Sequence, residues 1–156
     1  MAEGVFQSLT KPSDKPHHPQ IADIDSAGTA AYHVGSDPDP RTVSTLRANG
    51  IDSYQHKARK FAPGDFTRFD YVFAMDNSNM EDLKAIRDRL LKSGKNENEL
   101  AKLMIWGDFG GRGKGEEVVD PYYGGSEGFD IAFEQMGRFT RGFLSHLENG
   151  EQSKDA

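Results

Sequence analysis

The stretch that decides the fold lies between Phe69 and Trp106, and reads FDYVFAMD at 69–76, SNMEDLKAIRDRLLKSG at 78–94 and LMIW at 103–106. The first segment is mostly apolar and aromatic over Phe69–Met75, which is typical of a strand buried on both faces of a parallel sheet. The second segment opens with a capping box of Ser78 and Glu81, repeats apolar residues at helical spacing and stops at a glycine. The third is a further apolar run. A strand, a helix and a strand in succession predict an α/β fold with a parallel sheet.

The residues before Phe69 continue this alternation. Ala2–Leu9 is predicted as a short amphipathic helix and Ile21–Asp25 as a short strand. A second helix is predicted with Asp39 as N-cap, Pro40 at its first position and Gly50 just beyond its end. These elements belong to the same predicted domain.

The end of the chain is predicted as one long helix from about Ser126 to Leu147, because aromatic and aliphatic residues recur there at helical spacing. A polar tail is expected over 148–156. The expected organisation is therefore a single domain over residues 1–147, which agrees with a total length of 156 residues.

Composition excludes several classes of function. The 19 basic and 25 acidic residues leave a net charge of −6, which argues against a nucleic-acid partner. No apolar run approaches the roughly 20 residues that span a bilayer, and residues 1–10 do not resemble a secretory leader, so we expect no membrane association and a cytoplasmic location. The sequence has no cysteine, which excludes disulfides, thiolate metal sites and a thiol nucleophile on these residues.

Three short motifs have simpler explanations than catalysis. GGRGKG at 110–115 differs from a nucleotide-binding phosphate loop at two required positions. His17 and His18 have no further ligands at metal-site spacing, so we predict no metal. Ser26 lacks the flanking glycines of a serine-hydrolase nucleophile.

Ligands of α/β proteins bind outside the carboxyl ends of the strands, which directs attention to the loops that follow Asp25, Met75 and Trp106. The segment DPYYGG at 120–125 lies in the last of these loops. It is either a simple turn, or a rigid backbone that presents Asp120 as a general acid to a leaving group whose aromatic ring lies on a tyrosine.

Six blocks together resemble the low-molecular-weight protein tyrosine phosphatases. They are MAEGVF at 1–6, IDSAGT at 24–29, DPDPR at 37–41, HKAR at 56–59, FDYVFAMD at 69–76 and DPYYGG at 120–125, in the family's order. The resemblance implies a three-layer α/β/α domain with four parallel strands in the order 2-1-3-4. It also implies hydrolysis of phosphotyrosine, in proteins or in small aryl phosphates, through a cysteinyl-phosphate intermediate and without metal or cofactor.

The same resemblance assigns expected roles to residues of this chain. One is a general acid, three would contact the substrate, and four would hold the phosphate loop and its surroundings in shape. They are Asp120 as the acid, Tyr32, Tyr122 and Tyr123 at the substrate, and Ser26, His56, Arg59 and Asp76 as supporting groups.

The chain departs from the family at its start. In the family, a central strand and a loop of the form Cys, five residues, Arg, Ser-Pro come directly before the stretch that resembles residues 1–6. We therefore expect a chain truncated at its N-terminus, marginal in stability, and inactive by itself because the nucleophile is absent. Three explanations stay open: a phosphatase whose sequence lacks its start, a shortened isoform that binds or regulates, and a relative with other cysteine-dependent chemistry such as arsenate reduction.

Overall fold

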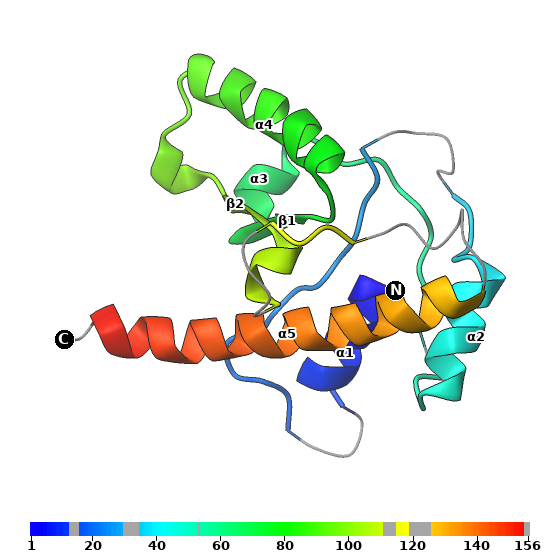
Figure 1. Ribbon diagram of the computed structural model, residues 1–156. Helices are drawn as coiled ribbons and strands as arrows, with labels where there is room; N and C mark the ends of the chain where they lie inside the picture. Colours follow the sequence, from blue (N-terminus) through cyan, green and yellow to red (C-terminus); the bar gives the residue numbers. More distant parts are fainter. Residues whose placement is uncertain (13–15, 30–34, 53, 111–114, 119–125, 155–156) are drawn as a thin grey trace.

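The computed structural model describes residues 1–12, 16–29, 35–52, 54–110, 115–118 and 126–154 (Figure 1). Its elements, with η for a short 3-10 helix, are α1 (Ala2–Thr10), α2 (Pro40–Ala48), α3 (Asp65–Arg68), β1 (Tyr71–Ala74), α4 (Asn77–Lys92), η1 (Glu97–Glu99), β2 (Lys102–Ile105), η2 (Trp106–Phe109) and α5 (Ser126–Lys154). No helix within these ranges is both long enough and apolar enough to cross a membrane.

The two strands form a small parallel sheet between helical layers. Tyr71 pairs with Lys102 and Ala74 pairs with Ile105. α4 lies on one side of the strands and α5 runs across the other (Figure 1). The predicted α/β class is confirmed, because a strand, a helix and a strand follow one another here with parallel pairing.

Alternate residues of β1 serve the two layers. Val72 and Ala74 are buried in the cluster beneath α4, which also contains Leu83 of that helix. Phe73 points to the opposite layer, where its ring centroid lies 4.9 Å from that of Phe143 in α5. Side chains of a strand alternate between faces, so a strand with apolar residues at successive positions can join two cores.

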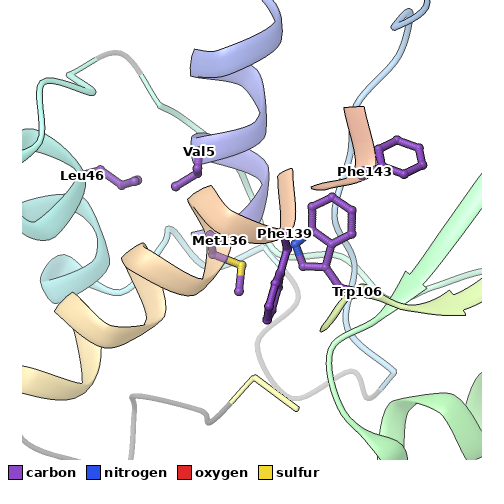
Figure 2. Close-up of a cluster of buried hydrophobic side chains, with 6 residues drawn as sticks. All are labelled: Val5, Leu46, Trp106, Met136, Phe139 and Phe143. Atoms are coloured by element: carbon purple, nitrogen blue, oxygen red, sulfur yellow. The ribbon is translucent and has the colours of Figure 1, made fainter. Parts of the chain in front are cut away.

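The larger core joins α1, α2, η2 and α5. Trp106 is 2% exposed and Phe139 is fully buried. Figure 2 shows how side chains from separate elements meet in this core. Its buried members are Val5, Leu46, Trp106, Met136, Phe139 and Phe143.

The predicted strand at Ile21–Asp25 is wrong. These residues adopt no regular secondary structure, and the bridge found nearest to them joins Gly28 to Lys60. A strand exists only where its backbone groups meet a neighbouring strand. Within the described residues, no such neighbour lies against this segment, and a cavity separates it from β1.

The caps of α2 agree with prediction, whereas the cap of α4 differs. Asp39 accepts a hydrogen bond from the Arg41 backbone N–H, at 2.8 Å. In α4 the N-cap is Asp76, which accepts from the Asn79 backbone N–H at 2.8 Å, so the predicted capping box that begins at Ser78 is wrong. A carboxylate two residues earlier already satisfies the first free N–H groups of the helix.

The last helix is longer than predicted. α5 continues to Lys154, whereas the periodicity of apolar residues ends at Leu147. Most of the segment predicted as a polar tail, residues 148–154, is therefore helical. A helix can continue beyond its packed part because backbone hydrogen bonds propagate from turns that are already formed.

Candidate functional site

Half of the predicted site residues lie in the described part of the chain. Ser26, His56, Arg59 and Asp76 are placed by the structure. The other predictions, which are Tyr32, Asp120, Tyr122 and Tyr123, lie outside the described residues. The site can therefore be built from its supporting groups.

Ser26 and His56 meet at Glu3, near the start of α1. Nδ1 of His56 lies 3.4 Å from Oε1 of Glu3, and the Ser26 hydroxyl lies 3.4 Å from the same oxygen. The other ring nitrogen of His56 lies 3.5 Å from the Ser26 hydroxyl oxygen. Glu3 is 5% exposed, so an almost fully buried carboxylate organises this cluster.

Arg59 extends the cluster through two aspartates. Its Nε donates to Asp25 at 2.9 Å, and its Nη1 donates to Asp65 at 2.9 Å. Asp25 in turn lies 3.7 Å from Nδ1 of His56 and accepts the backbone N–H of Ser26 at 2.8 Å. Because charged partners are shared along this path, Glu3 and Asp65 belong to one continuous network.

The pKa of a carboxyl group is raised at one end of this network, at Glu3, and lowered at the other end, at Asp65. Burial raises the pKa of Glu3, although the nearby His56 and a hydrogen bond from Tyr54 oppose the shift. Burial also raises the pKa of Tyr54, and the Glu3 carboxylate adds to it. At Asp65, burial favours a higher pKa, but hydrogen bonds from Arg59 and from the Ala62 N–H outweigh it and hold the pKa below its usual value.

Asp76 lies outside this network. Its carboxylate caps α4, as described above, and it faces the same cavity as the network does. The cavity has a volume of about 720 Å³, and Glu3, Ser26 and Arg59 lie along its wall. The network and Asp76 therefore line the same cavity, which Ala2, the first residue of α1, also lines.

Three donors in the cluster are close enough to hold a metal ion. One oxygen each from Glu3 and Asp25 and one nitrogen of His56 lie within 4.8 Å of one another. These carboxylates also accept hydrogen bonds from Tyr54, Arg59 and Ser26. The arrangement is therefore satisfied by the protein's own donors, as buried charges require.

Four members of the network are absent from the predicted site residues, namely Glu3, Asp25, Tyr54 and Asp65. Glu3 stands in the first turn of a helix, where an acidic residue is commonly a solvated partner of the helix dipole. Tyr54 and Asp65 carry no local motif. Glu3 lies close to the apolar residues Val5 and Phe6 in the same predicted helix, and this proximity is the one sequence feature that could have indicated its burial. Whether a carboxylate is buried, however, depends on contacts with residues distant in the sequence.

A family model described as low molecular weight phosphotyrosine protein phosphatase matches residues 1–153. The chain belongs to that family. A phosphatase of the same description from Schizosaccharomyces pombe is 40% identical, over 94% of this chain and 87% of its own length.

Solved structures agree with this membership of the low molecular weight phosphatase family. The crystal structure of a protein tyrosine phosphatase from Entamoeba histolytica has a TM-score of 0.79 and 31% identity, over 96% of this chain and 88% of that one. A structure described as the Drosophila arginine phosphatase has the same TM-score and identity, over 94% and 87%. Both likenesses extend over nearly the whole domain, so the fold of this family member is that of its relatives.

The four described supporting residues lie at two places along the cavity wall. Ser26 and His56 are within contact distance, and Arg59 joins them through Asp25. Asp76, by contrast, supports a helix rather than this network. The supporting roles of all four residues stay predictions.

Proposed function

We propose that this chain supplies the scaffold, the general acid and the substrate-contacting residues of a phosphatase that acts on phosphotyrosine, in proteins or in small aryl phosphates, and that needs neither metal nor cofactor. Asp120 is the general acid that protonates the phenolic oxygen, while Tyr32, Tyr122 and Tyr123 contact the aromatic ring. The observation that carries the proposal is the family match over residues 1–153. A cytoplasmic location belongs to the same proposal.

The buried network supports this proposal in a specific way. Glu3, Ser26 and His56 join the first turn of α1 to the residues that follow Ile24. A helix start favours anions, because its free N–H groups point outward. These contacts support the proposal that the network holds such an anion site in shape.

The chemistry needs a thiol that these 156 residues do not contain. A thiolate attacks phosphorus well when a helix N-terminus and positive neighbours lower the pKa of the thiol, and the same donors stabilise the transition state. Loss of a nucleophile costs on the order of 10⁶ in rate. We therefore propose that hydrolysis requires a cysteine-bearing segment outside the 156 residues, and that the chain alone is inactive.

The lack of cysteine favours a second candidate. A catalytically inactive shortened form could bind a partner protein through the same scaffold. Capture of a defined partner by the folded 156-residue chain, without turnover, supports that candidate. A chain that shows no cooperative unfolding contradicts it, because a specific partner surface needs a defined fold.

Turnover of p-nitrophenyl phosphate at mildly acidic pH tests the first candidate. We expect none above background for the 156 residues, and clear turnover when a strand and a Cys-x5-Arg-Ser-Pro loop are added before Met1. In the extended chain, Asp120→Asn should lower kcat about 10²- to 10⁴-fold, whereas Asp130→Asn on exposed α5 surface should leave kcat unchanged.

Each outcome of this experiment has a clear meaning. Turnover by the 156 residues contradicts the need for a thiol. An extended chain that folds but does not act on aryl phosphates contradicts the phosphatase proposal. Comparison of phosphotyrosine and phosphoarginine peptides then tests the substrate class, since one structural relative is described as an arginine phosphatase.

A further inference from the structure

The segment at residues 115–118 is attached to the junction between β1 and α4. The backbone N–H of Val118 donates to the carbonyl of Met75, the residue after β1, at 2.9 Å. The carboxylate of Glu117 accepts the backbone N–H of Asn77, the first residue of α4, at 2.8 Å. This segment therefore lies where β1 ends and α4 begins.

Arg138 of α5 holds the same segment through Glu116. Nη1 and Nη2 of Arg138 donate to Oε1 and Oε2 of Glu116, at 2.9 and 2.8 Å. Nη1 also donates to the carbonyl of Gly110, the residue after η2, at 2.8 Å. A bidentate bond between an arginine and a carboxylate fixes the orientation of the carboxylate as well as its distance. Arg138 thus joins α5, the end of η2 and Glu116 to one another.

The ion pair of Arg138 and Glu116 is sheltered from water. The two side chains are 16% and 19% exposed. Nε2 of Gln135, three residues earlier in α5, donates to Oε2 of Glu116 at 3.1 Å. Partly buried charges are screened much less than exposed ones, so this pair holds the segment more firmly than a surface ion pair would.

The elements around this ion pair are themselves closely packed. Met136 and Phe139 of α5 are 2% exposed and fully buried, and both belong to the core in Figure 2. A Cβ at Gly107 of η2 would lie 1.7 Å from the carbonyl oxygen of Glu116, so residue 116 packs directly against η2. A group supported by packed helices is positioned more precisely than one supported by a loop.

The segment leads directly to the predicted general acid. Asp120 follows Val118 by two residues in the sequence. Because consecutive Cα atoms are about 3.8 Å apart, the Cα atoms of Val118 and Asp120 lie within about 8 Å of each other. The attachment of residues 115–118 therefore limits where the carboxylate of Asp120 can be.

We propose that Arg138 is a positioning residue for the general acid, because by holding Glu116 it fixes the base from which the chain continues to Asp120. The inference rests on the proposed function, in which Asp120 protonates the leaving oxygen. That proton transfer requires hydrogen-bond distance between the two groups, so a looser base costs rate even when Asp120 itself is intact. Arg138 acts through Glu116 and does not touch the substrate.

Hydrogen exchange of the 156-residue chain is the first measurement. Arg138→Gln removes the bidentate pair and should make the Val118 amide exchange faster. Ala101 serves as the internal reference, because its N–H donates to the carbonyl of Phe66, at 2.7 Å, in the core beneath α4. We expect the ratio of the Val118 rate to the Ala101 rate to rise at least about tenfold, since local opening raises only the first of them.

Arg141→Gln is the matched control, because Arg141 lies three residues further along α5 and is exposed. It should leave the ratio of the two exchange rates as it was. An unchanged ratio in Arg138→Gln overturns the proposal. A rise of the same size at both amides also overturns it, because Arg138 then acts only on global stability.

Turnover by the chain extended with the Cys-x5-Arg-Ser-Pro loop is the second measurement. A general acid matters most when the leaving group is poor, as in phenyl phosphate, and least when it is good, as in p-nitrophenyl phosphate. Arg138→Gln should lower kcat/KM for phenyl phosphate about tenfold more than for p-nitrophenyl phosphate, and Asp120→Asn should show the same selectivity. A merely structural effect would lower both values equally, and Arg141→Gln should lower neither.

The outcomes separate this inference from the proposed function. A folded extended chain without turnover contradicts the proposed function, and with it the role of Arg138 in catalysis. An active extended chain in which Asp120→Asn is selective, but Arg138→Gln lowers both kcat/KM values equally or not at all, overturns the role of Arg138 alone.

Discussion

Nδ1 of His56 lies 3.4 Å from Oε1 of Glu3, a carboxylate whose side chain is 3% exposed. The two residues are more than fifty positions apart in the sequence, and they connect α1 to the segment that follows α2. Because Glu3 is buried, its contacts are coupled to the stability of the whole domain.

Glu3→Gln should change how stability depends on pH. Burial raises the pKa of Glu3 in the folded chain above the ordinary value of 4.5. The folded state then binds this proton more tightly than the unfolded state does, so the stabilisation is complete below the unfolded pKa and is lost as pH rises through the folded pKa. The Glu3→Gln variant has no proton to lose at this position. Its urea midpoint should therefore fall less steeply than that of the unmodified chain as the pH rises above 4.5.

Glu99→Gln is the matched control, because Glu99 is exposed in η1. Its urea midpoints should follow those of the unmodified chain at every pH. A Glu3→Gln profile parallel to that of the unmodified chain would show that the Glu3 proton is not linked to folding.

Arg59→Met should destabilise the fold by about 2–3 kcal/mol. The guanidinium is the shared partner of Asp25 and Asp65, and its loss leaves the carboxylate of Asp65, which is 6% exposed, without its cation. Arg89→Met removes an arginine from the exposed face of α4 and should cost much less. Equal urea midpoints for the two variants would contradict a structural role for Arg59.

Asp76→Ala should cost about 1 kcal/mol, while Ser78→Ala should be close to neutral. The Asp76 carboxylate accepts the Asn79 backbone N–H, so its removal leaves a helix N–H unsatisfied. Asp76→Asn should retain most of the stability because an amide oxygen can accept the same bond. If Ser78→Ala lowers the melting temperature more than Asp76→Ala does, the capping box at Ser78 and not Asp76 starts α4.

Gly142→Ala and Gly137→Ala should have opposite effects, although both lie in α5. A Cβ at Gly142 would lie 1.8 Å from the carbonyl oxygen of Phe109, so η2 and α5 must separate and the domain should lose several kcal/mol. A Cβ at Gly137 meets only the flexible end of Arg141, at 3.1 Å. Alanine there should raise stability by up to about 1 kcal/mol.

Differential scanning calorimetry of the two glycine variants is the suitable measurement, because both changes add one methyl group to the same helix. If Gly142→Ala melts at or above the temperature of the unmodified chain, the close approach of η2 to α5 is wrong.

Much of the architecture could be predicted because its signals are local. Asp39, Pro40 and Gly50 mark the ends of α2 through effects that act within one helical turn, and Gly50 takes a φ of 83°. The strand at Tyr71–Ala74 follows from its run of apolar and aromatic residues, although only Val72 and Ala74 are fully buried. Membership of the phosphatase family follows from motifs spread over the whole chain.

The supporting site could be predicted only in part. Ser26, His56 and Arg59 belong to quoted motifs, but their connection through Glu3, Asp25 and Asp65 is not written in any local pattern. The electrostatics of those carboxylates depends on burial, which no spacing rule contains.

The amino-acid order by itself determined where α2 begins and how the apolar faces of the helices repeat, since capping and periodicity involve residues within about one helical turn of each other. Tertiary structure alone decided that Ile21–Asp25 stays outside the sheet and that Glu3 is buried against His56. The physical reason is the same for both. A strand needs a second backbone for its hydrogen bonds, a buried carboxylate needs distant donors, and neither partner is specified within a short window of sequence.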